Sequence, residues 1–215
     1  MSEFLENLRN DHQDFDSGNL VDYFPENPLD LFELWFKEAL ERKEPETNAL
    51  VLSTIDITEN KPSSRIVYLK ELINSEFVFY TNYNSQKGKE LAQNANACML
   101  FFWPGLQRQI RIEGLVTMID EAISDAYFAS RPRESQIGAW SSYQSDKLSE
   151  RIELENRFIE LSESFGGEIP RPPHWGGYAL KPNLIEFWQG RPSRLHDRIV
   201  YEISENDWVI YRKNP

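Results

Sequence analysis

The sequence predicts a mainly β protein with peripheral helices, an α+β fold built on an antiparallel barrel or sandwich. Between residues 49 and 118, five short segments rich in β-branched and aromatic residues alternate with turn-like segments, which is typical of antiparallel strands. Strand-like segments return after residue 177. Segments with helical periodicity lie before, between and after the first five strands, so we expect helices around one sheet-based core.

Composition limits the number of domains and the classes of partner. The chain has 215 residues, 35 of them acidic and 23 basic, and a net charge of −12. This length suits one domain, expected at residues 28–215, with residues 1–27 as an N-terminal flap or flexible segment. The negative charge opposes broad contact with nucleic acid. Cys98 is the only cysteine, and no apolar run approaches about 18 residues, so we expect a cytoplasmic protein that makes no membrane contact.

The first helix is predicted to begin at Pro28, because Asn27 can cap it and proline is favoured at the first helical position. Apolar residues recur at three- and four-residue spacing from Leu29 to Leu40. The strands are then expected at residues 49–56, 64–70, 76–81, 97–103 and 107–118, and later at 177–180, 184–189, 195–203 and 208–212.

A short helix is expected at residues 85–95, between the third and fourth strands, with Ser85 as its cap and Lys87 in its first turn. A cation there opposes the helix dipole unless an anion is bound nearby, so Lys87 hints at a phosphate; the alternative is a lysine in solvent. Two further helices are predicted at residues 120–130 and 146–165. The loop between them carries two arginines and five hydroxyl residues, a composition typical of binding loops.

The segment from Arg194 to Arg198 combines two arginines and a histidine at alternate positions. If it is extended, Arg194, His196 and Arg198 project from one face while Leu195 points to the other. Such a face suits a phosphate dianion or an electron-rich ring, and the alternative is an edge strand protected by charge.

Several common sites are not supported by the sequence. There is no Gly-x-Gly-x-x-Gly motif after a strand and no Gly-Lys-Ser/Thr phosphate loop. The three histidines, His12, His174 and His196, are scattered and the cysteine is single, so no metal site is expected. From the residues alone, the sequence indicates a β-barrel that binds phosphorylated small molecules.

Five motifs, in this order, resemble the pyridoxamine 5'-phosphate oxidase family. They are Arg65 to Lys70, Tyr80 to Asn82, Ser130 to Trp140, Ile185 to Gly190 and Arg194 to Arg198, and the resemblance covers nearly all of the chain after Asn27. It implies an FMN-binding split β-barrel that forms a homodimer with FMN at the interface. It also implies oxidation of pyridoxamine or pyridoxine 5'-phosphate to pyridoxal 5'-phosphate by O2, with release of H2O2 and, from the amine, ammonia.

The resemblance further implies the residues of the site. Arg194 and His196 would position the substrate and stabilise charge. The cofactor would contact Arg65, Ile66, Val67, Tyr68, Leu69, Lys70, Tyr80, Thr81, Gln86, Lys87, Gln109, Gln144, Ser145, Trp188 and Arg198. The substrate would contact Lys70, Tyr127, Arg131, Ser135, Arg194, Leu195 and His196.

The residue pattern adds independent expectations to three of these assignments. Gln109 has opposite strand parity to Ile110 and Ile112, so it should point away from the apolar face. Pro132 disfavours helical geometry at Arg131, so this arginine should sit where the chain leaves a helix. Arg65 and Lys70 have opposite parity on one predicted strand, which suits one contacting the cofactor and the other the substrate.

Two departures from the family pattern accompany this resemblance. Gln86 stands where members usually carry an arginine, which removes one cation from the expected FMN phosphate site. In the segment Leu8 to His12, a histidine stands where members commonly carry a tyrosine in a flap over the substrate, and no role is assigned to this segment. Two alternative functions remain open: a split-barrel flavoprotein that oxidises another substrate, and a non-enzymatic module that binds a flavin or pyridoxal phosphate.

Overall fold

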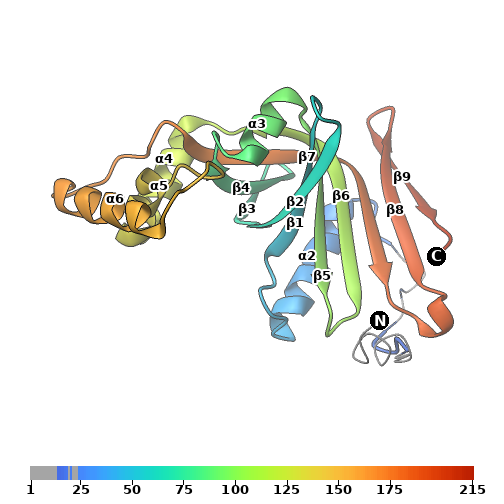
Figure 1. The fold of residues 1–215 in the computed structure, drawn as a ribbon. Coiled ribbons are helices and arrows are strands. Elements are labelled where there is room, and N and C mark those ends of the chain that lie inside the picture. Colours follow the sequence, from blue (N-terminus) through green and yellow to red (C-terminus); the bar gives the residue numbers. More distant parts are fainter. Residues whose placement is uncertain (1–13, 19, 21–23) are drawn as a thin grey trace, which may run out of the picture. The chain divides into compact units, whose positions relative to one another are not determined.

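A computed structural model describes residues 14–18, 20 and 24–215 (Figure 1). His12 and the segment Leu8 to His12 lie outside these residues. The strands are β1 (Ala49–Asp56), β2 (Lys61–Tyr68), β3 (Glu71–Ile73), β4 (Glu76–Asn82), β5 (Asn96–Trp103), β6 (Arg108–Met118), β7 (Trp175–Gln189), β8 (Asp197–Ser204) and β9 (Asp207–Arg212). The helices are α2 (Pro28–Glu41), α3 (Gln86–Gln93), α4 (Glu121–Ser130), α5 (Arg133–Ser141), α6 (Arg151–Ser164) and the 3-10 turn η1 (Pro192–Arg194).

The nine strands form one sheet in the order β2-β1-β5-β6-β7-β4-β3, with β8 paired to β7 and β9 paired to β8. The pairs β1–β2, β3–β4, β4–β7, β7–β8 and β8–β9 are antiparallel. The predicted mainly β, antiparallel fold with surrounding helices is therefore confirmed. None of the helices in the described part of the chain is long and apolar enough to cross a membrane.

The helix starts follow the capping residues seen in the sequence. The Asn27 side chain accepts from the backbone N–H of Leu29 at 3.2 Å, Ser85 caps α3, and Asp120 accepts from the N–H of Ala122 at 2.7 Å. Each side chain satisfies a backbone donor that the first helical turn leaves free. These three predicted helix starts are thus confirmed with their physical cause, whereas the fourth helix, expected at residues 146–165, begins only at Arg151.

Some element boundaries differ from those predicted. β2 begins at Lys61, three residues before the strand start expected at residue 64, and it contains Pro62. Proline is tolerated there because β2 ends the sheet order and an edge strand can do without one N–H group. The loop expected at residues 131–145 contains the helix α5, and the strands expected at 177–180 and 184–189 are one strand, β7.

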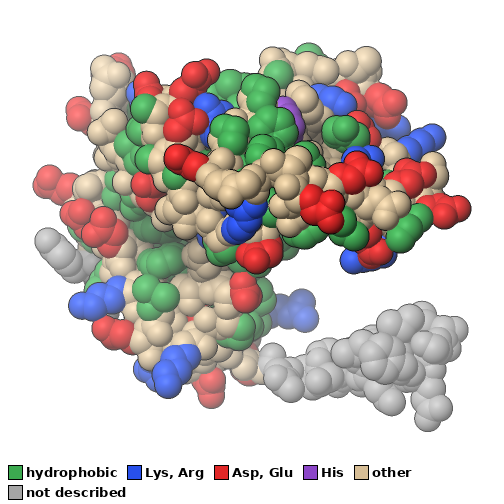
Figure 2. Space-filling view, turned by 90° about the vertical axis from the view of Figure 1, so that its left-hand side faces the viewer, with side chains coloured by type: hydrophobic (Ala, Val, Ile, Leu, Met, Phe, Trp, Pro, Cys, Tyr) green, Lys and Arg blue, Asp and Glu red, His purple; other side chains and the backbone are tan. Residues whose placement is uncertain are grey.

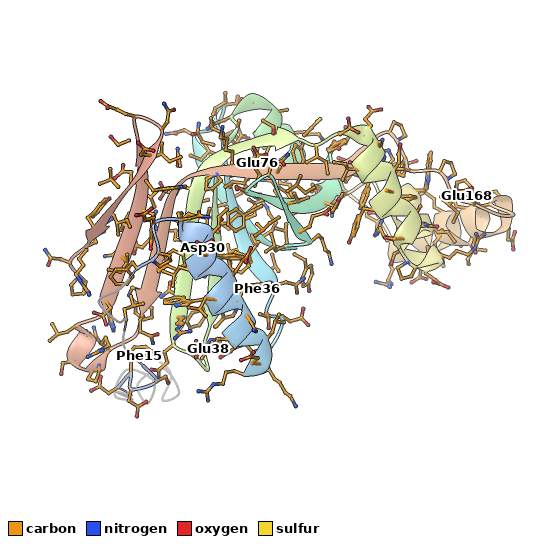
Figure 3. All side chains as sticks on the ribbon, turned by 180° about the vertical axis from the view of Figure 1, so that it is seen from behind. Phe15, Asp30, Phe36, Glu38, Glu76 and Glu168 are labelled. Atoms are coloured by element: carbon orange, nitrogen blue, oxygen red, sulfur yellow. The ribbon has the colours of Figure 1, made fainter. Side chains whose placement is uncertain are left out.

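The chain divides into two compact units, described separately here. The first consists of the described residues up to Thr47, with Leu100–Ile112 and Leu184–Pro215. Its core is aromatic: Phe32 of α2 packs edge-on against Phe101 at 5.6 Å between ring centroids, and Trp35 packs against Phe187 at 5.3 Å. Figure 3 labels Asp30, Phe36 and Glu38 on α2; Glu38 forms an ion pair with Arg108 at 2.6 Å.

The second unit consists of Asn48–Met99 and Glu113–Asn183. A buried cluster of Phe128, Ile137, Ile169 and Trp175 joins α4, α5 and the beginning of β7. Figure 2 views the molecule from the side on which Figure 1 draws α6, and acidic, basic and apolar side chains are interspersed on that face. This second unit holds the cavity described next.

Candidate functional site

A cavity of about 650 Å³ lies within the second unit. This volume falls inside the range of about 300–1,000 Å³ typical of small-molecule sites. Eleven residues that the sequence assigned to cofactor or substrate line it: Ile66, Val67, Tyr68, Lys70, Tyr80, Thr81, Lys87, Tyr127, Arg131, Ser135 and Gln144. The cavity walls also include Asn82, Pro132, Gly138, Ala139, Ser142 and Trp175, which sequence reasoning did not identify.

Lys87 carries a buried positive charge at the start of α3. Its Nζ donates to Thr81 Oγ1 at 2.9 Å, to Gln144 Oε1 at 3.0 Å and to Ser85 Oγ at 3.1 Å, and only 8% of the residue is exposed. Burial and, to a smaller extent, the positive charge of Arg65 lower the pKa of Lys87 to about 8, while the nearby Glu90 carboxylate acts in the opposite direction. A bound anion would offset both effects, so the solvated-lysine alternative does not describe this side chain.

Arg65 and Gln86 do not line the cavity but meet at one buried carboxylate. Glu90 is 3% exposed; it accepts from Arg65 NH2 at 3.2 Å and from Gln86 Nε2 at 2.9 Å. Ser63 and Thr54 also donate to it, and these bonds lower the pKa of Glu90 although burial raises it. The charge of Arg65 is therefore balanced locally, whereas the cavity cations Lys87 and Arg131 form no ion pair with described residues.

Arg131 sits where predicted, at the end of α4. Its backbone is extended (φ −75°, ψ 150°), since the following proline disfavours helical geometry. One terminal nitrogen, NH1, is buried and has no hydrogen-bond partner among the described residues. Burial lowers the pKa of Arg131, with Tyr127 acting in the opposite direction. A buried guanidinium N–H without an acceptor costs folding free energy. An anionic acceptor such as a phosphate oxygen in this part of the cavity would satisfy it.

Three aromatic rings form a near-parallel column beside Arg131. Tyr80 and Tyr127 stack at 3.9 Å between centroids and 17°, and Trp175 lies 5.6 Å from Tyr80 at 11°. The Tyr80 hydroxyl donates to Glu71 at 2.6 Å; burial and this carboxylate raise the pKa of Tyr80. Trp175 directly precedes Gly176-Gly177, where the lack of side chains allows neighbouring rings to approach closely, but this pattern does not distinguish it from a core tryptophan.

The parity argument for Lys70 was wrong. β2 ends at Tyr68, so Lys70 lies in the link to β3, where its backbone N–H donates to Val78 at 2.9 Å. Its ammonium group lies 5.3 Å from the ring centroid of Tyr68. Lys70 nevertheless lines the cavity, whereas Leu69, which is buried, and Ser145, which is exposed, do not.

The remaining predicted residues, Gln109, Trp188, Arg194, Leu195, His196 and Arg198, belong to the first unit. The expected alternation from Arg194 to Arg198 is wrong, because residues 192–194 form the 3-10 turn η1 and both Ser193 and Arg194 have positive φ (57° and 61°). Pro192 fixes the turn's first dihedral and prevents a continuous strand. Arg194 and Leu195 are exposed, and the strand β8 begins only at Asp197.

His196 is held in one orientation. Its Nδ1 accepts from the backbone N–H of Arg191 at 3.1 Å, which leaves Nε2 to carry the ring proton. The centroid of the His196 ring lies 4.6 Å from that of the Trp188 ring and 5.5 Å from that of the Phe15 ring. Burial and Arg194 lower the pKa of His196, while Asp14 raises it. The neutral ring therefore offers a hydrogen-bond donor at neutral pH.

Arg198 is fixed by a second buried carboxylate, Glu186. The Arg198 Nε donates to Glu186 at 2.7 Å, and Arg111 donates to the same carboxylate at 2.8 Å. Arg198 NH1 also donates to the backbone oxygen of Asn214 at 3.0 Å. Ile110 and Ile112 of β6 are buried, whereas Gln109 and Arg111 are only partly buried. The side chain of Gln109 therefore lies on the face opposite to the two isoleucines, as predicted.

Comparison with known proteins gives the family. Residues 36–163 match the model described as pyridoxamine 5'-phosphate oxidase, and residues 175–215 match the pyridoxine 5'-phosphate oxidase C-terminal dimerisation region. The chain belongs to the pyridoxamine 5'-phosphate oxidase family. The resemblance inferred from the five motifs is confirmed.

Relatives of known sequence or structure agree with this family. The pyridoxine/pyridoxamine 5'-phosphate oxidase of Leptospira biflexa serovar Patoc is 55% identical over 190 residues, which cover 88% of this chain and 89% of that protein. PhzG from Burkholderia lata, solved in complex with tetrahydrophenazine-1-carboxylic acid, is 31% identical with a TM-score of 0.85, covering 92% of this chain and all of that chain. A pyridoxamine 5'-phosphate oxidase-related, FMN binding protein from Nostoc punctiforme shares the fold, with 17% identity and a TM-score of 0.68 over 91% of this chain and 100% of that one.

Proposed function

We propose that this protein oxidises pyridoxamine or pyridoxine 5'-phosphate to pyridoxal 5'-phosphate, with FMN as cofactor and O2 as electron acceptor. Family membership and the name of the Leptospira relative support the reaction. The observation that carries it in this chain is the cavity, where neither Lys87 nor Arg131 forms an ion pair with a described residue and Arg131 NH1 has no hydrogen-bond partner among the described residues. Two phosphorylated molecules, a cofactor and a substrate, require two such positions.

The residues around Lys87 fit the phosphate of FMN. Lys87 supplies a charge, Thr81 a hydroxyl group and Gln144 an amide, and all three line the cavity. Charge-assisted hydrogen bonds of this kind contribute about 1.5–3 kcal/mol each. Held there by Lys87, Thr81 and Gln144, FMN would supply the acceptor for the two electrons and the hydrogen removed from the substrate carbon, with O2 as the final acceptor and H2O2 as its product.

The residues around Arg131 fit the phosphate of the substrate. Arg131, Lys70, Ser135 and Tyr127 together offer a guanidinium, an ammonium and two hydroxyl groups on the cavity wall. Their role is to hold the substrate at a fixed distance from the cofactor, so that the carbon bearing the amine or alcohol is presented for oxidation. Water then hydrolyses the imine formed from the amine to the aldehyde and ammonia.

Arg194 and His196 would complete the site from the partner subunit. The match of residues 175–215 to a dimerisation region supports a homodimer, and we place the FMN sites at its interface. His196, with its proton on Nε2, would donate to the substrate ring, and the exposed Arg194 would stabilise developing charge. Neither is assigned as an obligate base. The cytoplasmic location expected from the sequence also remains a prediction.

A second candidate is oxidation of a carboxylic acid without a phosphate, since PhzG was solved with such a compound. The donors Arg131, Lys70, Ser135 and Tyr127 together favour the phosphate ester, because a dianion with three terminal oxygens accepts from more of them than a carboxylate with two.

The test is to compare turnover of pyridoxamine 5'-phosphate with that of unphosphorylated pyridoxamine. We expect kcat/KM to favour the phosphate ester by about a hundredfold or more, from two or more charge-assisted bonds. Arg131→Leu should remove most of this preference. Equal turnover of both compounds by the unsubstituted protein would contradict the proposed substrate.

A further inference from the structure

We infer that Trp175 is a positioning residue of the substrate phosphate site, holding the Arg131 guanidinium in place without neutralising its charge. The inference rests on the proposed function, and it adds a residue that neither the motifs nor the family resemblance assigned. The Arg131 Cζ lies 4.5 Å from the centroid of the Trp175 ring and 5.6 Å from that of Phe128. Both distances are within the range of cation–π contacts, which are strongest with tryptophan.

The contrast with Arg65 shows why an aromatic partner matters. Arg65 is oriented by a carboxylate, Glu90, which cancels its charge. Arg131 has no carboxylate partner among the described residues, and its NH1 atom makes no hydrogen bond. An aromatic face can fix the plane of a guanidinium while leaving its N–H groups and its charge available to a ligand.

Trp175 is itself rigidly held, as a platform must be. Only 7% of the residue is exposed. Its backbone N–H donates to Pro172 at 3.0 Å, and its backbone oxygen accepts from Arg171 at 2.7 Å. Trp175 also pairs in register with Asn82 of β4. The backbone that carries the indole ring is therefore fixed by the sheet, and the ring itself packs edge-on against Phe128 at 5.2 Å between centroids.

The glycine two residues later makes room for the aromatic column. A Cβ atom on Gly177 would lie 2.9 Å from Tyr80 Cε1 and 2.3 Å from Ile119 Cδ1, so a side chain there would displace the Tyr80 ring. Tyr80 and Tyr127 both stack parallel to Trp175, at 11° and 6°. The aromatic column of Tyr80, Tyr127 and Trp175 thus extends from the sheet to α4, the helix that Arg131 directly follows.

The experiment measures binding of pyridoxal 5'-phosphate to the FMN-loaded protein by calorimetry, with FMN affinity measured separately by flavin fluorescence. Trp175→Leu should weaken the binding of pyridoxal 5'-phosphate by about three- to thirtyfold, which is the fold-change expected from loss of a cation–π contact. The affinity for FMN should not change. In steady-state assays KM should rise more than kcat falls.

A matched control separates positioning from general packing. Trp140 packs against the same hydrophobic cluster, but its ring is tilted against Phe165 and edge-on to His174, and it has no ring contact with Arg131. Trp140→Leu should leave pyridoxal 5'-phosphate affinity unchanged. If Trp140→Leu and Trp175→Leu weaken binding equally, or if Trp175→Leu binds as tightly as the unsubstituted protein, the inference is wrong.

A double-mutant cycle gives the sharpest result. In an Arg131→Leu background, Trp175→Leu should have no further effect on pyridoxal 5'-phosphate binding, because the group that it positions is gone. The cycle is also run with Trp175→Phe, which keeps an aromatic face and should weaken pyridoxal 5'-phosphate binding only about two- to threefold. This second cycle still tests the inference if the Trp175→Leu variant does not fold. Additive losses in both cycles would overturn the inference. Failure of the unsubstituted protein to bind pyridoxal 5'-phosphate would instead contradict the proposed function.

Discussion

Lys87 is the residue whose charge the fold controls most directly. It is buried at a helix start, next to the positive charge of Arg65, and both features favour its neutral form. A phosphate dianion reverses this preference. The residue therefore couples cofactor binding to proton uptake in the physiological range.

The pH dependence of FMN affinity follows from this coupling. The pKa of Lys87 is about 8 without ligand, so the ammonium form is dominant at pH 7 and is lost as the pH rises through 8. FMN should then bind about tenfold more weakly at pH 9 than at pH 7, since its phosphate stays a dianion across this range. Fluorescence titrations at each pH provide the measurement. Lys87→Met should bind weakly with no such slope; an unsubstituted protein whose affinity is constant or rises with pH would refute the assignment.

Gln86 stands where the family resemblance leads us to expect an arginine. Its amide donates to Glu90 at 2.9 Å, so the side chain already has a partner next to Arg65. Gln86→Arg should restore a cation near the FMN phosphate and tighten FMN by about ten- to a hundredfold. Gln86→Met, of similar length but neutral, is the control for loss of the Glu90 bond. An arginine variant that binds FMN no better would show that Glu90 captures the added charge.

At the scale of elements, α3 depends on a glycine for its close approach to the turn before it. A Cβ on Gly88 would lie 2.0 Å from the backbone oxygen of Tyr83, whereas a Cβ on Gly138 of α5 meets nothing within 4 Å. Gly88→Ala should therefore destabilise the protein by about 1–3 kcal/mol, and Gly138→Ala should stabilise it by about 0.5–1 kcal/mol. Urea unfolding followed by circular dichroism measures both. If both substitutions changed the free energy of unfolding in the same direction, this interpretation of α3 would be wrong.

Local signals in the sequence predict the elements that they cap, and they miss those that tertiary contacts stabilise. Asn27, Ser85 and Asp120 mark helix starts, since each cap is a short-range hydrogen bond. α5 has no side-chain cap, and its Ile137 packs into the Phe128 cluster, so its helical state depends on contacts with distant residues. The 3-10 turn at Pro192 likewise needs positive φ at Ser193 and Arg194, which strand alternation cannot anticipate.

The same distinction applies to the candidate site. The cavity residues on β2 and β4 were assigned from the family resemblance of their motifs, and only Lys87 of α3 was also indicated by the residue pattern, as a cation in a first helical turn. Trp175 could not, because a buried tryptophan at a strand start is usually interpreted as core and its contact with Arg131 joins residues 44 positions apart. The roles of Glu90 and Glu186 also depend on burial, which composition does not reveal.

At the scale of the whole molecule, the proposed site draws on two subunits. Lys87 would come from one and Arg194 from its partner, so each single variant disables both sites of its own homodimer. Co-expression of Lys87→Met with Arg194→Ala should give mixed dimers in which one site is intact, restoring about a quarter of full activity after random pairing. Activity in the mixture no higher than in either variant alone would place both residues in one subunit.

The measurement that tests the central claim most directly is the visible spectrum of the FMN-loaded protein. Pyridoxamine 5'-phosphate is added without oxygen, air is then readmitted, and the aldehyde is quantified. We predict that the flavin absorbance bleaches on addition of the substrate and recovers with oxygen, with pyridoxal 5'-phosphate formed in step. A bound flavin that remains oxidised under these conditions would contradict the proposed activity.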